Sequence, residues 1–363
     1  MKKTLIFAGI LALSMSQANA QIKGAGSSFA ANLYSSWSQV AGNASDPPME
    51  YEPIGSSGGV KAAQDRSVDF GASDRPLSRT LLDQAGLVQF PTAIGGVVLV
   101  TNVPGIPSGK IKLDGESLAA IYMGRIKQWN DPMLKALNPE LTLPAIAVTP
   151  VFRSEGSGTS FALTTYLSKL SAQFKTSVGA TSNFNVASGK AAKKSDDVAN
   201  AVRDTTGAIG YVDYSYASNH GLQSAQMKNQ WGNFVSAGGE SIQLAMRSAD
   251  WVKLLIDQDP TFEMDLTDAG CPQCWPIASA TYILVPLKGR NGNSVRVLEF
   301  FEQALLQGDE AAIKKGYVPL PGRAKNMISV AIRRWYASLD KAGAGRSPRR
   351  SQDEQRPNVV AAL

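Results

Sequence analysis

Histidine and cysteine are scarce in this chain of 363 residues, which contains one histidine and two cysteines. Nucleophile sites of the Ser-His-Asp type and histidine-rich metal sites need more histidine than this. The single one, His220, lies in the polar stretch SNHGL and is predicted to be a loop residue. The loop G-x-x-x-x-G-K-[ST] of nucleotide-binding proteins is also absent. Hydrolysis at a triad, metal-dependent hydrolysis and nucleotide binding are therefore disfavoured.

Long apolar runs are absent after the N-terminal segment, so no later segment is predicted to cross a bilayer. The N-terminus, MKKTLIFAGILALSMSQANA, has two lysines, an apolar stretch and an A-x-A sequence at 18–20. This pattern is typical of a secretory signal peptide over 1–20, cleaved after Ala20. No cysteine lies near that point to carry a lipid. We expect a soluble exported protein.

The net charge of the predicted folded region is small. The formal charge of +6 includes Lys2, Lys3 and a surplus of three positive charges in residues 341–363, which leaves +1 for residues 21–340. A nearly neutral core argues against nucleic acid as a partner. The basic tail 341–363 is rich in Pro, Gly and Arg and is predicted to be disordered. A solvated terminus is favoured there over a polybasic binding site.

The two cysteines, Cys271 and Cys274, stand close together in CPQC. Redox chemistry or half a zinc site would fit this spacing in a reducing compartment. The export signal favours a short structural disulfide across a turn instead.

Hydrophobic periodicity alternates between helix-like and strand-like segments. Helices are predicted over 29–40 (Phe29, Leu33, Trp37 and Val40), 118–122, 161–170 and 295–305, the last with Ser294 as N-cap and Gly308 as C-cap. Strands are predicted over 95–102, 208–214 and 280–287, and the run GGVVLVTN is typical of a buried parallel strand. This alternation predicts α/β lobes with parallel sheets.

Three segments combine glycine with small hydroxyl residues at a predicted helix start: GAGSSF (24–29), GSSGG (55–59) and RSEGSGTS (153–160). Helix N-termini present free N–H groups and the positive end of the dipole, and glycine lets the backbone approach a ligand. Any one loop alone favours a simple helix cap. Three in one chain, one of them beginning with Arg153, favour an oxyanion site.

Asp74, in the segment DFGASDRPLS, is an unusual neighbour for an anion. A carboxylate repels a fully deprotonated anion but accepts a hydrogen bond from one that carries a proton, as hydrogen phosphate does and sulfate does not. An ordinary salt bridge with Arg75, or a helix cap, is the equally weighted alternative.

GSSGG also matches G-x-S-x-G, with Ser57 in the nucleophile position. That reading needs an accessible histidine as a base. The chain offers many donors for an anion and no evident general base or metal cage, which favours binding and release over catalysis. An exported phosphoesterase, or a receptor for another oxyanion such as arsenate, is the alternative.

The segments GAGSSFAANLY, PIGSSGGVKAA, VDFGASDRPLS, FPTAIGGVVLVTNVPG, RSEGSGTSF and GAIGYVDYSYA together resemble the periplasmic phosphate-binding proteins of bacterial phosphate ABC transporters, over roughly residues 21–340. The resemblance implies an α/β fold, a two-lobe type II periplasmic-binding clamshell with hinge strands. It also implies one phosphate in the cleft, no cofactor or metal, a periplasmic monomer, and delivery to transmembrane permease subunits.

The family's ligand contacts fall on residues of both lobes of this chain. They are Ser28, Phe29 through its N–H, Ser56, Asp74, Arg153, Ser157, Gly158 and Thr159, with Glu155 orienting Arg153. In the family the Asp accepts the phosphate proton. Ser28 stands where relatives often have Thr, and Glu155 where they often have Asp. CPQC and the tail are outside the pattern.

The family layout also divides the chain. Lobe one is expected over 21–94 and 278–340 and lobe two over 95–277, with crossings near 94–96 and 276–280. Two such crossings make a hinge, and closure is expected to bury the anion.

Overall fold

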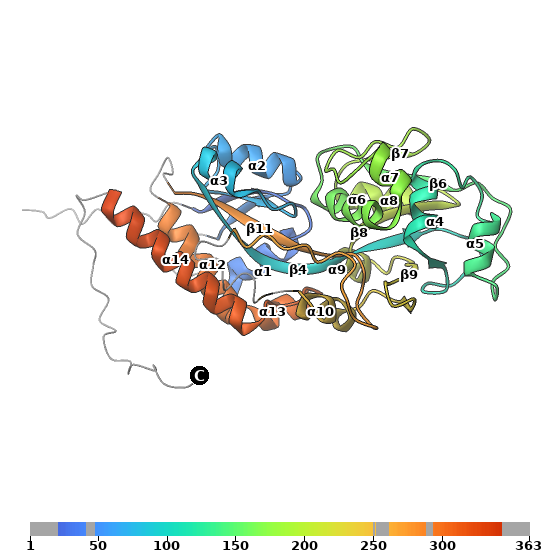
Figure 1. Cartoon of the computed structure of the whole chain (residues 1–363). Helices are drawn as coiled ribbons and strands as arrows, with labels where there is room; N and C mark the ends of the chain where they lie inside the picture. Colours follow the sequence, from blue (N-terminus) through green and yellow to red (C-terminus); the bar gives the residue numbers. More distant parts are fainter. Residues whose placement is uncertain (1–20, 41–47, 250, 252–260, 288–292, 343–363) are drawn as a thin grey trace, which may run out of the picture.

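A computed structural model describes residues 21–40, 48–249, 251, 261–287 and 293–342 (Figure 1). The predicted signal peptide lies outside the described residues, as does the predicted tail from residue 343 onward. The last helix, α14, continues to Ala342, so the first two residues of the predicted tail, Lys341 and Ala342, are helical.

Strands and helices alternate through the chain, as its periodicity predicts. The strands are β1 (Lys23–Gly26), β2 (Glu50–Glu52), β3 (Phe70–Ser73), β4 (Leu87–Thr101), β5 (Lys112–Leu113), β6 (Thr149–Arg153), β7 (Lys190–Ala192), β8 (Ala208–Asp213), β9 (Gln226–Lys228), β10 (Phe234–Val235) and β11 (Ala278–Pro286). The helices are α1 (Ala31–Val40), α2 (Ser56–Gln64), α3 (Arg79–Ala85), α4 (Gly115–Tyr122), α5 (Pro132–Leu137), α6 (Gly158–Leu170), α7 (Ala172–Ser177), α8 (Lys194–Arg203), α9 (Tyr214–Asn219), α10 (Gly239–Arg247), α12 (Ser294–Gln307), α13 (Asp309–Lys314) and α14 (Gly322–Ala342).

Two lobes share one curled sheet with the strand order β2-β1-β3-β11-β4-β8-β6-β7. The first lobe carries β1, β2, β3 and β11 with α1, α2, α3, α12 and α14, and the second carries β6, β7 and β8 with α4 to α8 (Figure 1). Strand β4 runs from one lobe to the other. It pairs with β11 up to Gly96 and with β8 from Val97 onward.

The prediction that GGVVLVTN forms a parallel strand is wrong. Strand β4 is buried along its whole length but pairs antiparallel with both β11 and β8. An unbroken apolar run reports burial on both faces of a sheet, and it carries no information about strand direction. The sheet is therefore mixed, with parallel pairs among β1, β2 and β3 and among β6, β7 and β8.

Aromatic clusters fill the core of each lobe. In the first lobe, Tyr34, Phe70 and Phe301 pack edge to face, with ring centroids 5.0 to 6.3 Å apart. In the second lobe, Tyr122 contacts Phe184 and Tyr211 at 5.4 and 5.9 Å. Large rings bury much apolar area, so these clusters fix the sheet on which the loops of interest are mounted.

Most predicted helix positions agree with the structure, and three differ. Phe29 is buried but lies before α1, which begins at Ala31. Val40 is 55% exposed, so it is no core residue although it continues the spacing of α1. The N-cap of α12 is Asn293, not Ser294, whose hydroxyl donates to the carbonyl oxygen of Pro286 at 2.6 Å. Gly308 is the C-cap, as predicted.

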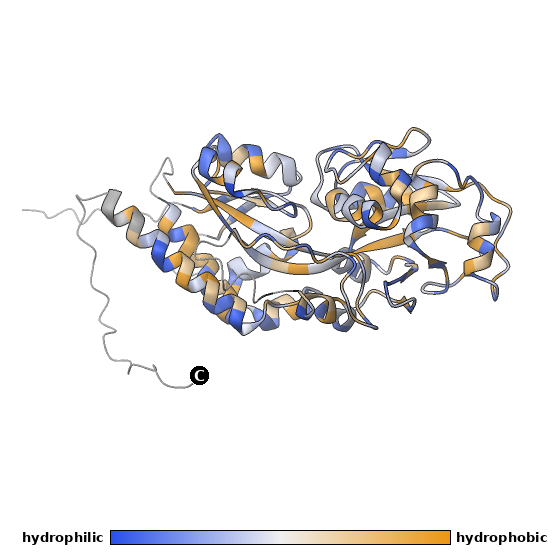
Figure 2. Cartoon of the chain, viewed as in Figure 1, coloured by the Kyte–Doolittle hydropathy of each residue, from blue (hydrophilic) through white to orange (hydrophobic). Residues whose placement is uncertain are grey.

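Helix α14 is long but amphipathic, with blue and orange bands along its length (Figure 2). Its buried residues Ala324, Ile328 and Ile332 recur at helical spacing. Among the residues that the structure describes, no helix combines the length and apolar character that crossing a membrane requires.

Cys271 and Cys274 form a disulfide with Cα atoms 5.2 Å apart. The Asn229 side-chain amide donates to the carbonyl oxygens of Cys271 and Pro272, at 3.3 and 3.0 Å. Next in the chain, the indole N–H of Trp275 donates to the carbonyl oxygen of Val97 at 3.1 Å. The CPQC turn therefore lies directly before the point where the chain meets β4.

Asp213, the last residue of β8, is a buried carboxylate that caps α9. Its Oδ1 accepts the N–H of Tyr216 at 2.7 Å, and its Oδ2 accepts the hydroxyl of Ser195 at 3.3 Å. Burial raises the pKa of Asp213 to about 7. Between about pH 4 and 7 the folded protein therefore binds more protons here than the unfolded chain does, so this group's stability contribution is lost as pH rises through 7.

We expect Asp213→Asn to raise the melting temperature at pH 8 by about 5 °C and to change it little at pH 5. Asparagine is a good N-cap and carries no charge whose burial is costly. Circular dichroism melts at the two pH values test this. A variant that melts below wild type at pH 8 would show that the ionised carboxylate stabilises the fold.

Candidate anion-binding site

The ends of β1 and β3 bring two polar residues of the first lobe together. These strands are parallel neighbours, with Gly26 opposite Ala72. The residues that follow each strand, Ser27 and Asp74, therefore leave the sheet at the same edge. Carboxyl ends of parallel strands are where α/β sheets bind ligands.

Three hydroxyl groups surround the Asp74 carboxylate. Ser27 Oγ lies 2.6 Å from Oδ1 and 2.7 Å from Oδ2, and Thr281 donates to Oδ1 at 2.6 Å. Ser56, the first residue of α2, donates to Oδ2 at 3.3 Å and accepts the N–H of Asp74 at 3.1 Å. The equally weighted alternatives, a salt bridge with Arg75 and a helix cap, are not what the structure places here. The Arg75 guanidinium lies over the Phe161 ring at 5.3 Å, and the N-cap of the following helix, α3, is Ser78.

Burial raises the pKa of Asp74. The hydrogen bonds from Ser27 and Thr281 and the charge of Arg153 oppose this rise without cancelling it. The hydroxyls therefore stabilise the ionised carboxylate in a site that is 5% exposed.

Arg153 ends β6 in the second lobe, and its side chain is 2% exposed. Its Nε donates to Glu155 Oε1 at 2.7 Å, and its Nη2 donates to the same oxygen. Nη2 also lies 3.4 Å from Ser28 Oγ in the first lobe. Burial opposes ionisation of Glu155, but the hydrogen bond and charge of Arg153 outweigh it, so the pKa of Glu155 is lowered. The carboxylate thus holds the guanidinium at the junction of the lobes.

The first turn of α6 faces Asp74 from the second lobe. Ser157 is the N-cap, and its Oγ accepts the N–H of Ser160 at 3.3 Å. A Cβ added at Gly158 would lie 2.4 Å from the Cβ of Asp74 and 2.5 Å from Ser56 Oγ. Only glycine allows this approach.

The predicted site residues therefore lie where the two lobes meet. Some contact a residue of the other lobe directly, and others are only buried nearby. Ser56, Asp74 and Gly158 pack together, and Ser28 reaches Arg153. Thr159 is buried in the first turn of α6. The Phe29 N–H, predicted to serve the anion, donates to Ser27 Oγ at 3.0 Å.

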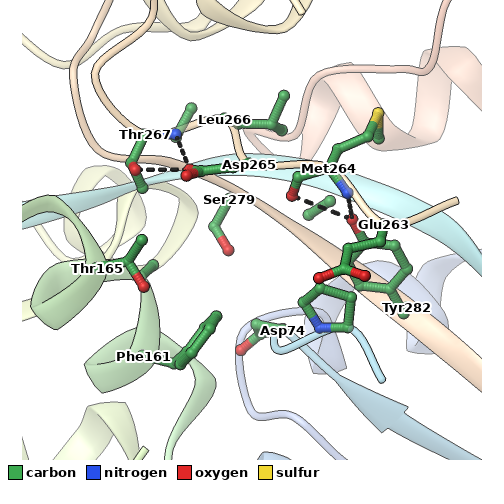
Figure 3. A pocket seen from close by; sticks show the side chains of 14 residues that line it. Asp74, Phe161, Thr165, Glu263, Met264, Asp265, Leu266, Thr267, Ser279 and Tyr282 are labelled. Carbon is green, nitrogen blue, oxygen red and sulfur yellow. Dashed lines mark hydrogen bonds between the residues drawn. The ribbon is translucent and has the colours of Figure 1, made fainter. Parts of the chain in front are cut away.

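A cavity of about 160 Å³ adjoins the site and is bordered by Asp74. Figure 3 shows Asp74 between Phe161 of α6 and Glu263, with Ser279 and Asp265 further along the wall. Among the described residues, no three or more His, Cys, Asp or Glu side chains are grouped so as to hold a metal ion. The chemistry that this junction supports is hydrogen bonding to an anion.

Comparison with known proteins places the chain in a family. A model described as the PBP superfamily domain matches residues 14–264. The chain is 39% identical over 339 residues to the phosphate-binding protein PstS of Haemophilus influenzae, a match that covers 93% of this chain and 99% of the relative. The chain belongs to the PstS family within the PBP superfamily.

Solved structures support the family's two-lobe periplasmic-binding fold for this chain. A high affinity periplasmic phosphate-binding protein (PfluDING), bound with phosphate, aligns with a TM-score of 0.67 at 20% identity, over 86% of this chain and 93% of that one. A putative phosphate ABC transporter substrate-binding protein from Clostridium perfringens aligns with a TM-score of 0.59 at 18% identity, over 83% and 100%.

Sequence reasoning missed three residues that organise this PstS-family site. GAGSSF contains both Ser27 and Ser28, and the resemblance to the family points to Ser28 alone. Thr281 lies inside a strand, where threonine is ordinary. The Tyr211 hydroxyl accepts the Arg153 N–H at 3.1 Å and pairs with the Ser160 hydroxyl at 2.7 Å. Strand register brings Thr281 and Tyr211 to the site, and no local motif signals it.

Proposed function

We propose that this protein binds inorganic phosphate between its lobes in the periplasm and delivers it to the transmembrane permease of a phosphate ABC importer. Its relatives are named for phosphate binding, which supports the ligand. The observation that carries the proposal is the pairing of a buried cation, Arg153, with a buried acceptor, Asp74, at one junction. The cation attracts an oxyanion, and the acceptor requires that the anion bring a proton.

Both lobes supply contacts in this proposal. The proposed contacts from the first lobe are Ser28, Ser56 and Asp74, together with the Phe29 N–H, whose hydrogen is shared between Ser27 Oγ and the anion when phosphate is bound. Those from the second lobe are Arg153, Ser157, Gly158 and Thr159. Arg153 has five N–H donors, more than its contacts to Glu155 and Ser28 use. Ser157 Oγ accepts an N–H within α6, so its hydroxyl hydrogen is free to donate to the anion. The first-turn N–H groups of α6 add donors aligned with the helix dipole.

The surroundings of Ser57 and His220, the residues that an esterase would use as nucleophile and base, favour binding over catalysis. Ser57, in the nucleophile position of G-x-S-x-G, is exposed, and its N–H donates to the carbonyl oxygen of Gly156 at 3.0 Å. His220 lies in the turn after α9, as predicted, and is the C-cap of that helix. Its ring stacks on Tyr216, and its Nδ1 lies 2.9 Å from that residue's carbonyl oxygen.

An assay of the purified, phosphate-stripped protein separates the two functions. We expect one phosphate bound per chain in equilibrium dialysis and no steady release of phosphate from a model ester. Steady release that is lost in Ser57→Ala would make the protein an esterase.

The lobes in this proposal are 21–94 with 278–340, and 95–277. The pairing switch of β4 at Gly96 and Val97 and the start of β11 at Ala278 supply the two crossings. Rotation about them opens and closes the junction, and the closed form docks on the permease. Residues 1–20 direct export and are removed, which places the mature chain in the periplasm as a monomer.

Gly158→Ala tests closure directly. The added methyl group would collide with Asp74 and Ser56, so the lobes cannot meet, and we expect phosphate binding at least tenfold weaker. Small-angle scattering with saturating phosphate is expected to give a larger radius of gyration than wild type gives. Gly239→Ala is the matched control, because a methyl group there meets nothing within 4 Å. Unchanged affinity and scattering in Gly158→Ala would refute closure at this contact.

A further inference from the structure

The Ser27 side chain occupies a fixed position between two groups of the site. Its Oγ accepts the Phe29 N–H at 3.0 Å and faces both oxygens of Asp74, at 2.6 and 2.7 Å. The residue is 0% exposed. Its backbone is held on both sides, because its N–H donates to Ala72 and its carbonyl oxygen accepts the Tyr51 hydroxyl at 2.6 Å. The hydroxyl therefore has little freedom to turn elsewhere.

The Ser27 hydroxyl fills one of the hydrogen-bond acceptor positions of the Asp74 carboxylate. An ionised carboxylate has two oxygens with about four lone-pair positions. Ser27, Thr281 and Ser56 each contribute one hydroxyl hydrogen. About one position remains, which matches an anion that brings one proton. Without Ser27, a second position opens and the carboxylate loses one of its two shortest hydrogen bonds.

We propose that Ser27 is a specificity-determining positioning residue, whose hydroxyl fixes the Asp74 carboxylate so that one acceptor position faces the anion. This inference rests on the proposed phosphate-binding function and assigns to Ser27 part of the preference for a protonated oxyanion. Ser27 acts through Asp74 and through the Phe29 N–H that it accepts, and it needs no contact with the anion itself.

The electrostatics of Asp74 agree with this role. Burial raises the pKa of Asp74, and the Ser27 hydrogen bond is the largest influence that opposes the rise. The other ionisable groups that act in this neighbourhood are Arg153, Asp213, Tyr34, Tyr51 and Tyr317. They are unchanged in a Ser27 variant, so a change in pH profile on removing this hydroxyl reports on Asp74.

The test compares Ser27→Ala with Ser294→Ala, a matched control that also removes a buried hydroxyl with a 2.6 Å hydrogen bond, outside the site. Calorimetry gives the dissociation constants for phosphate and sulfate at pH 8, and for phosphate down to pH 5.5. In Ser27→Ala we expect the phosphate-over-sulfate ratio to fall by about 10- to 100-fold. Phosphate binding is also expected to be lost at a higher pH on acidification. Ser294→Ala is expected to keep the wild-type ratio and profile.

Ser27→Thr keeps the hydroxyl and is expected to keep the ratio. An equal loss of affinity for both anions in Ser27→Ala, with an unchanged pH profile, would reduce Ser27 to a packing residue and overturn the inference. The same holds if Ser27→Thr loses the ratio as fully as Ser27→Ala does. A wild-type protein that binds no phosphate would instead overturn the proposed function itself.

Discussion

Arg153→Ala is expected to weaken phosphate binding by about a thousandfold. The guanidinium is 2% exposed, and it is the cation that lies within reach of both Ser28 and Glu155 at the junction. Removing one partner from a buried ion pair costs about 3 to 5 kcal/mol, or roughly two to four powers of ten. Isothermal titration of the phosphate-stripped variant measures the loss.

Two companion variants show which property of Arg153 matters. Arg153→Lys keeps the charge but loses the planar fork that Glu155 engages, and we expect an intermediate loss. Arg125→Ala removes an exposed arginine that follows α4, so it controls for net charge alone. Binding by Arg153→Ala within tenfold of wild type would show that the anion does not lie against this guanidinium.

Asp74→Asn is expected to lower the preference for phosphate over sulfate by about 10²- to 10⁴-fold. The amide offers N–H donors where the carboxylate offered only acceptors, so a sulfate oxygen no longer meets a lone pair. Phosphate affinity is expected to fall much less than the ratio does, because the donors from Arg153 and the helix starts are unchanged.

The matched control for this change is Asp69→Asn, which also converts a hydrogen-bonded carboxylate of the first lobe into an amide, at the end of β3 opposite to Asp74. We expect it to leave the phosphate-to-sulfate ratio at the wild-type value. Titrations with both anions, at a pH where phosphate is mainly singly protonated, give the ratio for each variant. An unchanged ratio in Asp74→Asn would mean that the carboxylate does not face the ligand's proton.

Much of the site could be predicted because helix starts have a local chemical signature. Glycine and small hydroxyl residues at 24–29, 55–59 and 153–160 do precede α1, begin α2 and begin α6. The requirement for free N–H groups and close backbone approach is met by a few consecutive residues. The resemblance to a family then united motifs that are far apart in sequence.

What could not be predicted depends on strand order and direction. Thr281 reaches Asp74 because β11 runs antiparallel beside β3, with Tyr282 opposite Ser73. The run in β4 signalled burial but not that both its neighbours are antiparallel. Ser27 and Ser28 are chemically equal in sequence, and only the turn after β1 decides which hydroxyl faces the carboxylate.

The most direct test of the central claim is a calorimetric titration of the phosphate-stripped mature protein with phosphate, in a large excess of sulfate. We expect tight binding at one site per chain, with sulfate leaving the affinity nearly unchanged, because Asp74 rejects an anion that has no proton. Absent binding, or binding abolished by sulfate, would contradict a proton-accepting carboxylate at the anion.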